Sequence, residues 1–85
     1  MQVALASALR SYTRNRERVA ASGATVDELL RCLDADYPGI RFRIVDEQER
    51  IRVHIRIFVN RQLAALSTAV RDGDDVQILC ALSGG

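Results

Sequence analysis

The sequence contains no lysine, one proline and only four aromatic residues among its 85 positions. All twelve basic side chains are arginine, so no side-chain amine is available for an isopeptide bond to another copy. With so few aromatics, a folded core has to be built mainly from Val, Ile, Leu and Ala. Cys32 and Cys80 are too few and too far apart for a disulfide framework or a zinc motif.

A strong net charge and a long apolar run are also missing. The formal net charge of +1 gives no general attraction to nucleic acid or to an acidic membrane. Among Arg10, Arg14, Arg16 and Arg18 the sequence places one aromatic residue, Tyr12, too few for a nucleic-acid surface, so we interpret these arginines as solubilising charge. The apolar runs are shorter than the ~20 residues needed to span a bilayer. The N-terminus lacks the basic head of a signal peptide, and we expect a soluble, cytoplasmic, single-domain protein.

The first 21 residues predict two strands. Val3, Leu5 and Leu9 share one phase of a period-two pattern, with alanines on the other phase, which favours a strand over residues 2–9. A polar hairpin loop over 11–15 and a second strand over 16–21 follow, and Ser22-Gly23 ends that strand.

A helix is predicted after residue 25. Thr25 and Glu28 have the spacing of a capping box, in which the Thr25 hydroxyl accepts from the Glu28 N–H and the Glu28 carboxylate reaches back to Thr25. Pro38-Gly39 ends the helix. The positions that follow helical periodicity and should face the core are Val26, Leu29, Leu30, Leu33 and Tyr37.

The second half predicts further strands. Residues 40–45 fit either a short helical turn or an extended piece, and residues 46–50 form a charged loop. From Ile51 to Asn60 strict alternation predicts a long strand with five β-branched residues facing inward. Tight turns are expected at 60–61 and 72–74, and a last strand begins at residue 75 or 76 and includes Cys80. The order is strand, strand, helix, strand, short strand, strand. It predicts an α+β β-grasp (ubiquitin-like) fold over residues 1–80, with a mixed sheet of four to five strands in which the last strand lies beside the first.

A flexible tail, residues 81–85, follows the last strand and ends in Gly84-Gly85. Without a Cβ, both glycines can extend through a slot too narrow for a side chain. The terminal carboxylate of Gly85 is a poor electrophile, but an acyl-adenylate has a good leaving group that a sulfur nucleophile can displace. Ordering five residues costs roughly 5–10 kcal/mol of backbone entropy. The folded body must therefore offset that cost through contacts with a partner.

Several segments in this order resemble a known family. These are Leu9-Arg10, residues 25–30, Pro38-Gly39, residues 58–60, residues 72–79 and Gly84-Gly85. The chain is similar to the ubiquitin-like sulfur carriers: the small subunit of molybdopterin synthase, the thiamine-pathway carrier and the cysteine-forming carriers. It differs at Cys80, where the family usually has proline.

The resemblance implies a protein cosubstrate rather than an enzyme. An E1-like adenylyltransferase/sulfurtransferase would use ATP to adenylate Gly85 and convert it to a thiocarboxylate. An acceptor synthase would then receive sulfur for cysteine, molybdopterin, thiamine or a secondary metabolite. No bound cofactor or metal is implied, and among these branches we favour the cysteine-forming or secondary-metabolite carriers.

Candidate partner-contacting residues lie near this tail. If Phe58 and Leu79 both project from the open face of the sheet, they form an apolar docking patch that Leu82 extends, although a loop could cover either of them. Arg52, Arg56 and Arg61 could face an acidic partner or form a solvated strand face. Tail residues Ala81 and Ser83 would enter the partner with the glycines.

The remaining chemistry-bearing residues have simpler interpretations. Cys80 and Cys32 are expected in the core, because free cysteine is often buried. His54 has no catalytic partner at a useful spacing. Two other functions stay open: a ubiquitin-like modifier joined through Gly85 to lysines of other proteins, and a β-grasp interaction module whose glycines are incidental.

Overall fold

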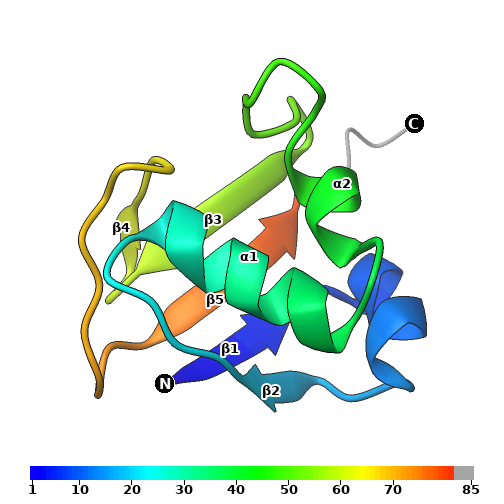
Figure 1. Cartoon of the computed structure of the whole chain (residues 1–85), viewed down its shortest axis with the longest axis horizontal. Coiled ribbons are helices and arrows are strands. Elements are labelled where there is room, and N and C mark those ends of the chain that lie inside the picture. Colours follow the sequence, from blue (N-terminus) through cyan, green and yellow to red (C-terminus); the bar gives the residue numbers. More distant parts are fainter. Residues whose placement is uncertain (82–85) are drawn as a thin grey trace.

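The structure is a computed structural model that describes residues 1–81 (Figure 1). Its elements follow in the order β1 (Gln2–Leu5), a 3-10 helix η1 (Ser7–Thr13), β2 (Arg18–Ala20), α1 (Val26–Asp36), α2 (Ile40–Ile44), β3 (Ile55–Val59), β4 (Gln62–Leu63) and β5 (Val76–Cys80). Within these residues, no helix is long and apolar enough to cross a membrane.

The strands form one mixed sheet in the order β2-β1-β5-β3-β4. β1 and β5 are parallel, with Val3 beside Val76 and Leu5 beside Ile78. The other pairs are antiparallel. The predicted neighbourhood of first and last strands is therefore confirmed, and the architecture is the expected β-grasp fold.

The core lies between α1 and one face of the sheet (Figure 1). Leu29, Leu30 and Leu33 of α1 are buried, as the helical periodicity predicts, together with Val3, Ile57 and other inward residues of the strands. Tyr37, also predicted on this face, is partly buried and packs against the core. No helix of the described chain covers the opposite face of the sheet (Figure 1).

The start of α1 matches the capping prediction in one of its two bonds. The Thr25 hydroxyl accepts from the Glu28 N–H at 3.2 Å. The Glu28 carboxylate accepts from the Ala24 N–H at 3.1 Å, one residue before the predicted Thr25. At the other end, α1 stops at Asp36, and Gly39 takes a φ of 98° that glycine adopts without strain. Residues 40–44 form the helical alternative, α2.

The first strand is only half as long as predicted. β1 ends at Leu5, and η1 takes up residues 7–13. The Ala6 N–H makes the last bond to β5, at Ile78, and the Ala6 carbonyl then accepts from Leu9, which starts the 3-10 turn. Leu9 belongs to this helix and not to a strand, and its side chain is buried from there. Its place in the period-two pattern is therefore coincidental.

The long strand predicted from Ile51 to Asn60 is wrong in its first four residues. Regular pairing begins only at Ile55, and Ile51 makes an isolated bridge with Val45. Between them the chain turns, because the Ile55 N–H donates to the Arg52 carbonyl at 2.9 Å. Val53 lies at this turn and is 86% exposed instead of facing inward.

Candidate partner-binding surface and tail exit

The tail leaves the sheet beside the turn over residues 52–55. β5 ends at Cys80, which is opposite Ile55 of β3. The next N–H, of Ala81, donates to the His54 carbonyl at 2.7 Å and holds Ala81 beside this turn. Ala81 is exposed. The other predicted tail residues lie outside the described part of the chain: Leu82, Ser83, Gly84 and Gly85.

The face of the sheet away from α1 carries an apolar patch near this exit. Leu79 is 41% exposed, Leu63 is 68% exposed and Phe58 is half-buried. Phe58 pairs with Leu63 across β3 and β4, so the two side chains share this face. We call Phe58, Leu63 and Leu79 the open-face patch. The structure thus places the two predicted residues, Phe58 and Leu79, on the predicted face.

Leu63 belongs to this patch but was missed from the sequence. It follows the turn at Asn60-Arg61, where both residues have positive φ values of 51° and 68°. Such a two-residue hairpin loop places the residue two after the loop opposite the residue two before it. That rule, applied to Phe58, identifies Leu63 as its neighbour.

The three candidate arginines have different surroundings. Arg56 is exposed beside the patch, opposite Leu79, and one of its guanidinium nitrogens donates to the carbonyls of Val53 and Ile55. Arg52 turns toward α2, where its Nε donates to the Phe42 carbonyl at 2.8 Å and its guanidinium lies 4.6 Å from the ring centre. Arg61 is exposed in the hairpin turn. Arg56 is therefore the one beside the open-face patch.

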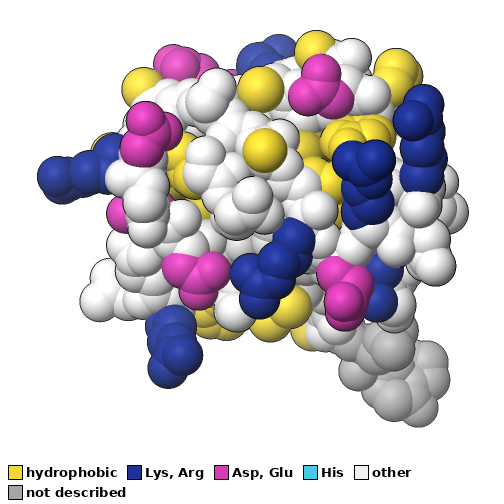
Figure 2. Space-filling model, turned by 90° about the horizontal axis from the view of Figure 1, so that it is seen from below, with side chains coloured by type: hydrophobic (Ala, Val, Ile, Leu, Met, Phe, Trp, Pro, Cys, Tyr) yellow, Lys and Arg dark blue, Asp and Glu magenta, His cyan; other side chains and the backbone are white. Residues whose placement is uncertain are grey.

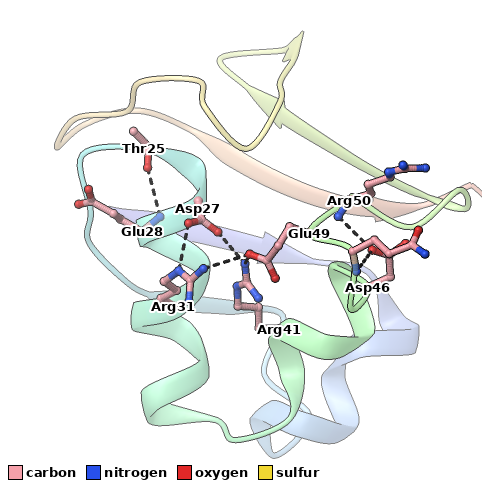
Figure 3. A network of polar contacts seen from close by, with 9 residues as sticks. Thr25, Asp27, Glu28, Arg31, Arg41, Asp46, Glu49 and Arg50 are labelled. Carbon is pink, nitrogen blue, oxygen red and sulfur yellow. Dashed lines mark hydrogen bonds and ion pairs between the residues drawn. The ribbon is translucent and has the colours of Figure 1, made fainter.

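A closed ring of ion pairs holds the 46–50 loop, which precedes the turn over residues 52–55 (Figure 3). Asp27 of α1 contacts Arg31 and Arg41 at 3.0 and 2.8 Å, and Glu49 of the 46–50 loop contacts the same two arginines at 3.1 and 3.0 Å. The Arg41 guanidinium is the main reason that the pKa of Asp27 lies below its ordinary value. The ring joins α1, α2 and the loop.

The charged loop has a structural role of its own. Asp46 accepts from the backbone N–H groups of Gln48 and Arg50 at 2.9 and 3.0 Å (Figure 3). The Arg50 N–H is the main cause of the lowered pKa of Asp46. These bonds hold the tight turn in which Glu49 has a φ of 61°. The loop acids therefore shape the chain rather than form a site.

The remaining candidates stand apart from one another. Cys32 and Cys80 are only partly buried, each packed against the core, and His54 is exposed at the turn. Within residues 1–81 no cluster of three or more His, Cys, Asp or Glu side chains could hold a metal ion. On the face seen in Figure 2, basic and acidic side chains alternate, and neither sign dominates.

Residues 3–85 match the ThiS family. The chain belongs to the ThiS family. This ThiS-family chain is 37% identical to the sulfur carrier protein CysO of Mycobacterium tuberculosis over 89 residues, covering 98% of the chain and 96% of the relative. It is 33% identical to small archaeal modifier protein 3 of Haloferax volcanii over 66 residues, covering 73% and 71%.

Solved structures agree with this membership. The crystal structure of the BexX/CysO complex of Amycolatopsis orientalis contains a chain with a TM-score of 0.91 and 34% identity, covering 99% of this ThiS-family chain and 98% of that one. CysO of Mycobacterium tuberculosis gives a TM-score of 0.90 at 33% identity, covering 95% and 98%. The protein is thus a ubiquitin-like, CysO-like member of the ThiS family.

Proposed function

We propose that this protein carries sulfur as a thiocarboxylate on Gly85. The match to the ThiS family through Gly85, together with 37% identity to a sulfur carrier along nearly the whole chain, is the observation that carries the proposal. The protein is a cosubstrate in this scheme. It supplies a folded body and an acyl group, and the partner enzymes supply the chemistry.

Two steps load the carrier. The Gly85 carboxylate attacks the α-phosphate of ATP on an E1-like adenylating enzyme, giving an acyl-adenylate and releasing pyrophosphate. A sulfur nucleophile such as hydrosulfide then attacks the acyl carbon, its proton is lost to solvent, and AMP leaves. The resulting thiocarboxylate can deliver its sulfur to a biosynthetic acceptor, which then yields cysteine, molybdopterin, thiamine or a secondary metabolite.

The described residues support a role for the body in docking. Ala81 leaves the sheet next to the open-face patch and Arg56, so an enzyme that receives the tail would meet apolar surface at its entrance. The burial of such residues contributes roughly 25 cal/mol per Å² of apolar area before the costs of association, and this gross gain helps to offset the ordering of the tail. Phe58, Leu79 and Arg56 are therefore the proposed docking residues, joined by Leu63.

Intact mass spectrometry of the untagged protein from its own host tests the proposal. We expect a fraction in which one oxygen is exchanged for sulfur, mapped to the peptide that contains Gly84-Gly85 and lost after alkylation and hydrolysis. Deletion of Gly84-Gly85 provides the control and should abolish it. A mass that stays unmodified after incubation with ATP, sulfide and the host's E1-like enzyme would refute the proposal.

Conjugation to other proteins is the second candidate. The similarity to small archaeal modifier protein 3 favours it, and the same Gly85 acyl-adenylate would serve both functions. Immunoblots of host lysate would show a ladder of conjugates under this alternative, whereas a pure carrier gives only the free protein.

A further inference from the structure

A shallow apolar groove lies along the outer edge of β3, next to the tail exit. β4 pairs with β3 through only two residues, and the Ala64 N–H makes the last bond, to Ile57 at 2.8 Å. Among the strands of residues 1–81, none therefore lies beside the first half of β3 on that side. The apolar residues that line the groove are Ile51, Val53, Ile55, Ile57, Leu63 and Ala64.

The backbone at this edge is not free to add a strand. The Ile55 N–H already donates to Arg52, and the Ile55 carbonyl accepts from Arg56 at 3.0 Å. The Val53 carbonyl accepts from the same nitrogen at 2.7 Å. A peptide that binds by strand addition depends on such main-chain groups for its affinity. The groove is therefore suited to a side chain and not to an extended strand.

The charge around the groove is positive. Among residues 1–81, Arg52 and Arg56 line it and no carboxylate does. Neither arginine makes an ion pair within residues 1–81, and both are held by hydrogen bonds to backbone carbonyls. Guanidinium groups that are already fixed lose little conformational entropy when a carboxylate binds. An occupant that complements this edge combines an apolar side chain with flanking Asp or Glu residues.

We infer that the adenylating enzyme docks here, by inserting an apolar side chain flanked by carboxylates into the edge groove. The inference rests on the proposed function. His54, whose carbonyl holds Ala81, belongs to the turn that presents Val53 to the groove, so one enzyme surface can contact both the groove and the entering tail. This contact explains why the apolar side chain of Val53 is 86% exposed in the free protein.

The test compares two variants that make the same change in charge. Val53→Glu introduces a carboxylate at the groove, and Ala8→Glu introduces one at an exposed position of η1. Both side chains are solvent-exposed, so the fold is retained, which circular dichroism and thermal unfolding would verify. The assay follows thiocarboxylate formation by mass with the host's purified E1-like enzyme, ATP and sulfide.

For Val53→Glu we expect the KM for the carrier to rise at least roughly tenfold, with kcat within about twofold, because docking is lost and the tail chemistry is intact. Ala8→Glu should match the wild type. An unchanged KM for Val53→Glu, beside a wild type that is loaded normally, would overturn the groove inference and leave the proposed function standing. A wild type that acquires no sulfur would overturn the proposed function itself.

Discussion

The ring of Asp27, Arg31, Arg41 and Glu49 gives a quantitative prediction about stability. Arg41 is the most buried member, with 15% of its side chain exposed, against 31% for Asp27 and 58% for Glu49. Exposed ion pairs contribute about 0–1 kcal/mol, and hydrogen bonds to charged groups about 1.5–3 kcal/mol. The Asp27–Arg41 contact lies between these limits, so we expect a coupling free energy of about 1–1.5 kcal/mol.

The loss from a single substitution should be smaller than two lost ion pairs would suggest. The Arg41 Nε is buried and finds no hydrogen-bond partner within residues 1–81, which destabilises the folded state by about 1 kcal/mol or more. Arg41→Met removes that unpaired group and keeps an apolar stem of similar length. We therefore expect Arg41→Met to lower the free energy of unfolding by only about 1 kcal/mol.

A double-mutant cycle isolates the coupling. Urea unfolding of the wild type, Arg41→Met, Asp27→Asn and the double variant at neutral pH and low salt gives the interaction term directly. Strictly additive single effects, with a coupling below about 0.3 kcal/mol, would refute the reasoning. Arg18→Met, an exposed arginine of β2 that makes no ion pair within residues 1–81, is the matched control and should change stability by less than about 0.5 kcal/mol.

The contribution of the Asp27–Arg41 pair to stability should depend on pH in a direction set by the pKa of Asp27. Because the folded pKa of Asp27 lies below its ordinary value, the contribution of the pair is complete above about pH 5 and is lost as the pH falls below about 4. The stability difference between wild type and Arg41→Met should therefore shrink in acid. A difference that stays constant down to about pH 2.5 would contradict this assignment.

Three further predictions concern the cap, the core and the open face. Thr25→Ala removes the bond from the Glu28 N–H and should lower the free energy of unfolding by about 1 kcal/mol, which calorimetry would show as a drop in Tm of about 4–8 °C. Thr25→Ser keeps the hydroxyl and should therefore keep the stability of the wild type. Leu33→Ala leaves a cavity at a fully buried site, so denaturant titration should show a loss of about 2–5 kcal/mol. Leu79→Asp should leave the Tm within about 3 °C of the wild type but raise the KM for loading by roughly tenfold or more; an unchanged KM would remove Leu79 from the docking surface.

The elements that could be predicted are those whose local chemistry is unambiguous. Thr25 and the spacing of Leu29, Leu30 and Leu33 define α1, because a cap and a helical face are both local properties. The turn at Asn60-Arg61 and the strand around Ile57 follow in the same way. The neighbourhood of β1 and β5 follows from the order of the elements, because that order restricts the possible topologies of so short a chain.

The errors occurred where the apolar and polar residues of the sequence keep alternating although the backbone changes direction. Val53 has the residue type and the phase of a strand, but the bond from Ile55 to Arg52 closes a turn, and nothing in a period-two pattern reports such a bond. Leu9 is similar, since a 3-10 turn happens to bury the residue that a strand would also bury. The edge groove depends on both the early end of β4 and this turn, so it could not be seen from the sequence.

The parallel pairing of β1 and β5 has a mechanical consequence. Met1 lies at one end of this central pair, held by a bond from its amino group to Ala21, and Ala81 lies at the other end. A pull applied between these two points loads the hydrogen bonds between β1 and β5 in shear, all at the same time, whereas pulling an antiparallel hairpin apart breaks its bonds one by one. A molecule drawn by its tail into a narrow channel would therefore resist unfolding until the whole central ladder gave way.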